Sequence, residues 1–177
     1  EGGVLPPLSI LIVFSGPERP FDGLATFLRA EGFTVIEVDT KVGGADHNVL
    51  RPRVAAEIEQ RISDGEFAAT FWAVPCESWS VAHRPQVRSR RQSGGLLAQL
   101  AVGGPLAHWA AYVAKHNRLA DWTARCVRLA HAVGTLFLIE NPADYGDDSS
   151  LAWWARFRDH APLWAYPPMA AVRRELG

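Results

Sequence analysis

The stretch LSILIVFSGP, residues 8–17, decides the fold. Residues 8–14 form a continuous apolar run rich in β-branched side chains, and a serine, a glycine and a proline end it. Strands of parallel sheets have this pattern because they are buried on both faces. The sequence therefore predicts a buried parallel strand over residues 8–14, followed by a loop.

Helices and strands alternate after this first strand. Further strands are predicted over residues 34–39, 67–74 and 136–139. Apolar residues at helical spacing predict helices around Leu24–Leu28, Val54–Ile62 and Trp109–Ala130, each ended by a glycine, with Pro105 as a start for the last helix. This order predicts one domain over residues 1–177, a Rossmann-like α/β fold with a parallel sheet and helices on both faces.

Composition narrows the class of protein. The formal net charge of −1 provides no overall attraction to nucleic acid or to anionic lipid, so any contact with a polyanion must be local. The two cysteines, Cys76 and Cys126, are far apart and lack the spacing of a zinc site, so we expect neither metal nor disulfide. The run over residues 8–14 is too short to span a membrane. We expect an intracellular protein, cytoplasmic or nuclear.

The first two predicted strands end in residues suited to binding a ligand. Gly16 and Gly23 follow the first strand, where glycine allows the backbone to approach a ligand closely. Neither phosphate-binding glycine motif is present, which favours a ligand without phosphates. Glu37 and Asp39 close the second strand, where an acid in a Rossmann unit commonly holds ribose hydroxyls. A solvated acid is the alternative for that position.

The third and fourth strands end in residues suited to catalysis. Cys76 follows the third strand and precedes a polar loop, so it is either a buried structural cysteine or a reactive thiolate in an electropositive setting. Glu140 and Asn141 follow the fourth strand. Carboxyl ends of parallel strands lie at one edge of the sheet, so we expect the thiol and the Glu140 carboxyl near one site, where partial burial favours proton donation.

Four short motifs follow one another along the chain: FSG at residues 14–16 with GL at 23–24, VIEVD at 35–39, VPCESWS at 74–80 and IENP at 139–142. In this order, over roughly residues 9–145, they resemble the motifs of the cytosine-5 DNA methyltransferases. The proline-cysteine and ENP motifs are the specific part of the resemblance. It implies transfer of a methyl group from S-adenosylmethionine to C5 of cytosine in DNA. Cys76 would attack C6 of a flipped-out base, Glu140 would contact N3 and the exocyclic amine, and Asn141 would position their loop.

The resemblance also implies two sets of binding residues. Those for the cofactor are Phe14, Ser15, Gly16, Gly23, Leu24, Glu37, Asp39, Asp46 and Pro75. The loop after Cys76 would contact DNA, through Ser78, Ser80, Arg84, Arg88, Arg90 and Arg91. A solvated basic loop is the alternative for these arginines. The string QVRSR at 86–90 also spells a motif that follows ENP in the family, and here we interpret it as coincidence or displaced function.

Some family features are not seen. Nothing resembles a target-recognition domain, and the closing strands and final cofactor-supporting helix are missing, so we expect a sheet that is incomplete or completed by another chain or segment. The helical stretch with Trp153, Trp154 and Phe157 either covers the sheet or forms an exposed patch. His108, His116, His131 and Cys126 are interpreted as structural. Two alternatives therefore stay open: a non-catalytic methyltransferase-like module that binds or assembles within a larger protein or particle, and an unrelated Rossmann-like enzyme.

Overall fold

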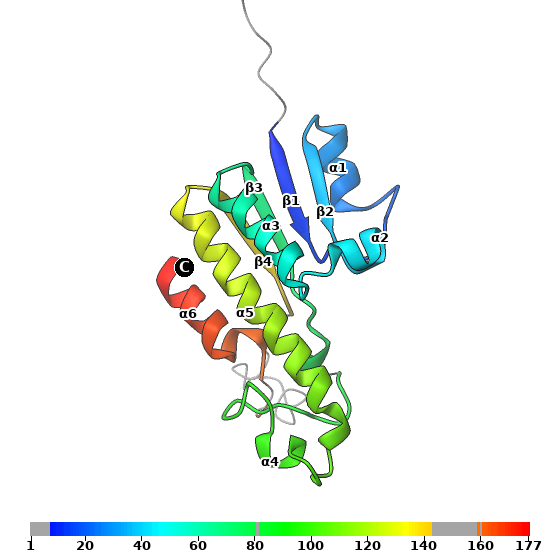
Figure 1. Ribbon diagram of the computed structural model, residues 1–177, viewed down its shortest axis with the longest axis vertical. Coiled ribbons are helices and arrows are strands. Elements are labelled where there is room, and N and C mark those ends of the chain that lie inside the picture. The colour runs from blue at the N-terminus through cyan, green and yellow to red at the C-terminus, as the bar shows by residue number, and fades with distance from the viewer. Residues whose placement is uncertain (1–7, 81, 143–158, 160) are drawn as a thin grey trace, which may run out of the picture. The chain divides into compact units, whose positions relative to one another are not determined.

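The computed structural model describes residues 8–80, 82–142, 159 and 161–177 and has a Rossmann-like α/β fold, as predicted (Figure 1). Its parallel sheet has the order β2-β1-β3-β4, with β1 at Ser9–Val13, β2 at Thr34–Val38, β3 at Ala69–Ala73 and β4 at Leu136–Glu140. The α-helices are α1 (Leu24–Ala30), α2 (Thr40–Gly43), α3 (Pro52–Ser63), α4 (Leu97–Leu100), α5 (Ala110–Ala132) and α6 (Pro167–Leu176). Short 3-10 helices are η1 (Gly44–His47), η2 (Glu77–Trp79), η3 (Ala107–Trp109) and η5 (Leu163–Ala165).

The two faces of the sheet are covered to different extents. Ile10 and Ile12 point to the face on which α1 packs, and they form a core cluster with Ala25 of that helix. The parallel register continues this face along β4 to Leu136 and Leu138, which are 74% and 52% exposed. On the opposite face, β1 and β3 present fully buried side chains, Leu11, Val13, Thr70 and Trp72. The described residues thus leave the β4 end of the α1 face open to solvent.

Residue contacts divide the chain into two compact units. Unit 1 consists of Glu1–Val74 and Arg125–Glu140 and holds the sheet, while unit 2 consists of Pro75–Ala124 and Asn141–Gly177. Helix α5 contributes residues 110–124 to unit 2 and residues 125–132 to unit 1. Each unit is therefore built from two separate segments of the chain. The prediction of a single domain over residues 1–177 stays a prediction.

The long helix starts five residues later than the predicted start at Pro105. Helix α5 begins at Ala110, because the residues between Pro105 and Ala110 form a hydrogen-bonded turn and a 3-10 helix instead of α-helix. The amide of Leu106 donates to the carbonyl of Gln99 at 2.9 Å, and the 3-10 helix η3 follows. The predicted helical stretch with Trp153, Trp154 and Phe157 lies outside the described residues. Within those residues, no helix combines the length and hydrophobicity needed to cross a membrane.

Candidate functional site

A cavity of 390 Å³ lies in unit 1 at the carboxyl ends of the strands and the start of α1. Its volume is within the usual range for a small-molecule site, about 300–1,000 Å³. The apolar wall consists of side chains on the α1 face of the sheet, including Ile12, Phe71 and Leu138. The position agrees with the rule that ligands of open α/β sheets bind beyond the carboxyl ends of the strands.

Five residues with predicted functions line this cavity: Ser15, Gly23, Leu24, Glu37 and Glu140. A local turn explains the glycine among them. The amide of Gly23 donates to the carbonyl of Arg19 at 3.2 Å, and a Cβ at this position would lie 2.7 Å from the same oxygen. The turn that leads into α1 therefore requires glycine at this position.

Three other predicted cofactor residues shape the rim of unit 1. Asp39 caps α2 through the amide of Lys41 (2.7 Å), and its other carboxyl oxygen accepts from the amide of Gly16 (3.0 Å). Phe14 has a φ of 63°, a left-handed conformation that turns the chain out of β1. The Asp39 carboxylate thus ties the loop after β1 to the end of β2, so its role here is to hold the loop. Asp46 lies exposed in η1, and Pro75 begins unit 2.

Negative charge predominates around the cavity. Among the described residues that line it, the carboxylates of Glu18, Asp22, Glu37 and Glu140 outnumber the guanidinium groups of Arg19 and Arg29. Arg29 donates to Glu37 at 2.7 Å, and the side chain of Glu37 is only 10% exposed. An excess of carboxylates attracts a cationic ligand and repels phosphate groups.

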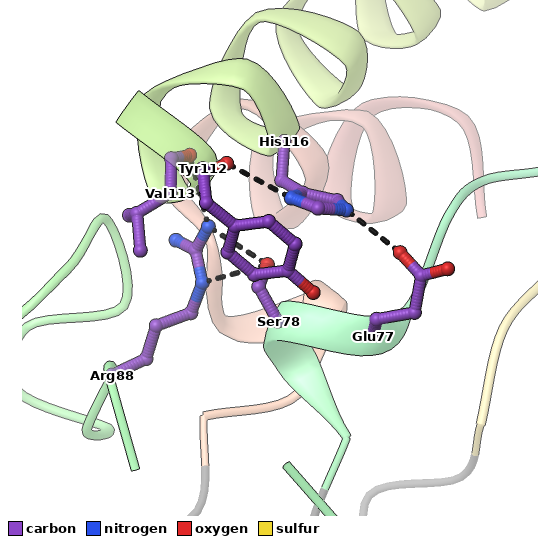
Figure 2. Close-up of polar contacts among 6 residues, drawn as sticks. All are labelled: Glu77, Ser78, Arg88, Tyr112, Val113 and His116. Atoms are coloured by element: carbon purple, nitrogen blue, oxygen red, sulfur yellow. Dashed lines mark hydrogen bonds and ion pairs between the residues drawn. The ribbon is translucent and has the colours of Figure 1, made fainter. Parts of the chain in front are cut away.

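The other predicted catalytic residue, Cys76, lies half-buried in unit 2, immediately before the short helix η2. The amide of Trp79 donates to the Cys76 carbonyl at 2.8 Å, which closes this turn. Glu77, the next residue, contacts His116 of α5, with 2.9 Å between Oε2 and Nε2 (Figure 2). By contrast, Cys126 is fully buried, and desolvation strongly raises the pKa of its thiol. This contrast agrees with a packing role for Cys126.

Arg88 and Ser78, predicted to contact DNA, instead lie in the interior of unit 2, which corrects that prediction for both. Arg88 is 2% exposed, and both its Nε and Nη2 donate to Ser78 Oγ, at 3.1 and 3.0 Å (Figure 2). The other acceptors are Ser93 O at 2.6 Å, Asn117 Oδ1 at 2.7 Å and Val113 O at 3.3 Å. The guanidinium also lies 4.0 Å from the ring of Trp79. With its donors engaged internally, Arg88 does not present them to a phosphate.

The remaining predicted residues of unit 2 differ in exposure. Arg84 and Arg91 are exposed, whereas Ser80 and Arg90 are half-buried. Asn141 is half-buried and belongs to unit 2 with Cys76, whereas Glu140 belongs to unit 1. Their assignments to DNA binding and catalysis stay predictions.

Sequence reasoning missed Arg29 at the cavity and the contact of His116 with Glu77, the residue that follows Cys76. A signal for the second was present, because His116 lies on the apolar stripe of α5 among Tyr112, Val113 and Ala120. A histidine on a buried face requires partners for both ring nitrogens. The sequence does not identify which acid provides one of them.

Among the described residues, no group of three or more His, Cys, Asp or Glu side chains is arranged to hold a metal ion. Comparisons with known proteins return no match to a family model, to a curated protein or to a solved structure.

Proposed function

We propose that the protein transfers a methyl group from S-adenosylmethionine to C5 of cytosine in DNA. The observation that carries the proposal is the acid-rich cavity of unit 1, which is lined by Ser15, Gly23, Leu24 and Glu37. These are four of the residues that resemblance to the cytosine-5 DNA methyltransferases assigns to the cofactor.

The chemistry of the cavity fits this cofactor. S-adenosylmethionine has a sulfonium cation, an adenosine and no phosphate, so an excess of carboxylates favours it over a phosphorylated nucleotide. Glu37 is the acceptor for the ribose hydroxyls, and Ile12, Phe71 and Leu138 provide apolar contact for the adenosyl group. When bound, the cofactor supplies the electrophilic methyl group.

In the proposed reaction, the chain supplies a nucleophile and an acid. The Cys76 thiolate adds to C6 of the cytosine ring, which makes C5 nucleophilic. Once C5 has taken the methyl group, it loses its proton and the C6–S bond breaks, which restores the thiolate. Glu140 hydrogen-bonds N3 and the exocyclic amine as charge develops in the ring. Arg84 and Arg91, both exposed, are the residues proposed to contact the DNA backbone.

Calorimetric titration with S-adenosylmethionine or its demethylated product tests the cofactor assignment. We expect saturable binding to the wild-type chain and weaker binding to Glu37→Ala. Glu31→Ala is the matched control, because Glu31 is an exposed acid at the end of α1, close in sequence to Glu37 and outside the cavity lining. Absence of binding to wild type, or equal loss in the control, would overturn the assignment.

Trapping on DNA that contains 5-fluorocytosine tests the nucleophile. We expect a covalent complex with wild type and with Cys126→Ser, and none with Cys76→Ser. The reaction contains S-adenosylmethionine. After methylation C5 holds fluorine in place of the proton, so the elimination that would free Cys76 cannot occur and the adduct accumulates. Equal trapping by Cys76→Ser would remove Cys76 from the mechanism.

A second function, a non-catalytic module that assembles within a larger protein or particle, is favoured by one observation. Leu136 and Leu138 of β4 and Phe27 of α1 (61% exposed) leave apolar surface exposed on unit 1. For this function we expect neither cofactor binding nor trapping, while substitution of Leu136 and Leu138 by Ser would abolish incorporation into the assembly. Cofactor binding with trapping at Cys76 would decide against it.

A further inference from the structure

The turn that carries Cys76 is anchored by the next three side chains. Glu77 binds His116, and Ser78 accepts two hydrogen bonds from Arg88. The Trp79 ring contacts the side chains of Arg88 and His116. The guanidinium carbon of Arg88 lies 4.0 Å from the centroid of the Trp79 ring, and the His116 ring packs edge-on, with 6.0 Å between the two ring centroids. The backbone beside the thiol is therefore fixed by contacts inside unit 2, which is the kind of support that a positioned reactive group requires.

His116 has an acceptor on each side of its ring. Its Nδ1 lies 2.9 Å from the carbonyl oxygen of Tyr112, one turn earlier in α5, and its Nε2 lies 2.9 Å from Glu77 Oε2 (Figure 2). A carbonyl oxygen and a carboxylate only accept hydrogen bonds. Both contacts are hydrogen bonds only when both ring nitrogens carry a proton, that is, when His116 is an imidazolium.

Several charged or titratable groups surround this pair. Glu77 faces His116 from η2, Tyr112 lies beside it on α5 with 4.3 Å between the ring centroids, and Arg88 and Tyr166 contact the intervening Trp79 ring. Desolvation raises the pKa of the Tyr112 hydroxyl, and negative charge on Glu77 and Cys76 raises it further. Cys76 and Glu77 therefore act electrostatically on the same neighbour.

We propose that His116 is a positioning residue that acts through Glu77 to keep the Cys76 thiol reactive. Its imidazolium anchors the Glu77 carboxylate and neutralises it. Without that cation, an unpaired negative charge would lie next to Cys76 in sequence and would disfavour the thiolate. The role of this thiol in methyl transfer rests on the proposed function, but its reactivity does not.

Alkylation by iodoacetamide, measured across pH without cofactor or DNA, tests the proposal. The rate reports Cys76, because Cys126 is fully buried and burial keeps its thiol protonated. A Cys76→Ser protein should show no fast labelling. For His116→Gln, which keeps a donor toward Glu77 but no positive charge, we expect the midpoint of the pH profile to rise by about one unit. The rate at pH 7 should fall about threefold, because a more basic thiolate is also a better nucleophile.

The decisive variant is the double substitution His116→Gln with Glu77→Gln. It removes both charges while two amides can still hydrogen-bond each other, so we expect the alkylation rate to return to within about 1.5-fold of wild type. Glu77→Gln alone should react at least as fast as wild type. A rate for His116→Gln within twofold of wild type, or a double variant as slow as the single one, would overturn the proposal.

Two controls keep the result interpretable. His131→Gln alters an exposed histidine of the same helix and should leave the rate unchanged. Circular dichroism and thermal melting identify a variant that fails to fold. Labelling of Cys126, which is buried in the folded protein, marks such a variant, and its alkylation rate does not count as recovery. If wild type shows neither trapping nor cofactor binding while His116→Gln still slows alkylation, the proposed function fails and this inference stands.

Discussion

Glu37 and Glu77 are each paired with a basic side chain, but the two pairs are buried in opposite ways. In unit 1, the Glu37 side chain is 10% exposed and its partner Arg29 is 45% exposed. In unit 2, the Glu77 side chain is 68% exposed and its partner His116 is 3% exposed. The fold therefore buries the acid of the cavity pair in unit 1 and the histidine of the Glu77–His116 pair in unit 2.

The difference indicates which member of each pair can change partners. An exposed arginine on a long side chain can release Glu37 to a ligand at little cost, because exposed ion pairs contribute little to stability. A buried histidine held at both nitrogens has no such freedom. Arg88 is the extreme case, since its described acceptors are neutral and desolvation lowers the pKa of its guanidinium to about 10. Arg88 still carries its charge at neutral pH.

The largest expected effect comes from Arg88→Met. The substitution leaves Ser78, Ser93, Val113 and Asn117 without their buried donor, so we expect the free energy of unfolding to fall by about 3 kcal/mol. Urea denaturation followed by tryptophan fluorescence measures the change. The control is Arg91→Met at an exposed position, with an expected change below about 0.5 kcal/mol. Equal stability of the two variants would show that the buried guanidinium contributes nothing to folding.

The next effect is an asymmetry within the Glu77–His116 pair. His116→Ala removes a buried ring with two hydrogen bonds, and we expect it to lower the free energy of unfolding by about 2 kcal/mol. Glu77→Ala removes an exposed carboxylate and should cost about 1 kcal/mol or less. The same denaturation experiment measures both. A larger loss for Glu77→Ala would reverse our view of which member the fold fixes.

For the Glu37–Arg29 pair at the cavity, the difference between the two residues should appear in ligand affinity rather than in the free energy of unfolding. Glu37→Gln keeps the shape of the side chain but removes its charge, and we expect affinity for S-adenosylmethionine to fall about tenfold, which corresponds to about 1.4 kcal/mol. Arg29→Met should alter affinity less. Calorimetric titration measures both variants, with thermal melting as the check on folding. Greater weakening by Arg29→Met would identify the arginine as the principal ligand contact.

The smallest effect is expected at Arg61 and Glu66, a pair partly exposed on both sides and joined by a 2.6 Å hydrogen bond. That bond lowers the pKa of the Glu66 carboxyl, so its contribution to stability is present above the ordinary pKa of 4.5 and is lost as pH falls through the lower folded value. Solvent screening limits it to about 0.5 kcal/mol. Comparison of wild type with Glu66→Gln at pH 7 and pH 3 should show a small difference at pH 7 only. A difference that persists at pH 3 would exclude this hydrogen bond as its source.

Local patterns in the sequence predicted the sheet and much of the cavity. Each predicted strand is a short apolar run ended by polar or special residues, and parallel strands deliver such ends to one edge. Gly23 and Glu37 could therefore be placed near one edge without knowing any long-range contact, whereas Ser15 came from the resemblance to a family. Glu140 extends the predicted fourth strand by one residue and also lines the cavity.

The polar interior of unit 2 could not be predicted in this way. Arg88 belongs to the basic string RSRR, which by composition reads as exposed, and its acceptors include Asn117, 29 residues away. Glu77 and His116 are separated by 39 residues. Such pairings depend on tertiary packing, which periodicity and residue type do not encode.

The acid excess around the cavity of unit 1 has a consequence for measurements made in different buffers. Dissolved salt screens attraction over about 10 Å at 0.1 M, so a cation held partly by that field should bind less tightly as ionic strength increases. The same carboxylates repel the phosphodiester backbone, and counterions weaken that repulsion. A salt series at constant pH therefore measures how much of ligand selection in this cavity is electrostatic and how much depends on shape.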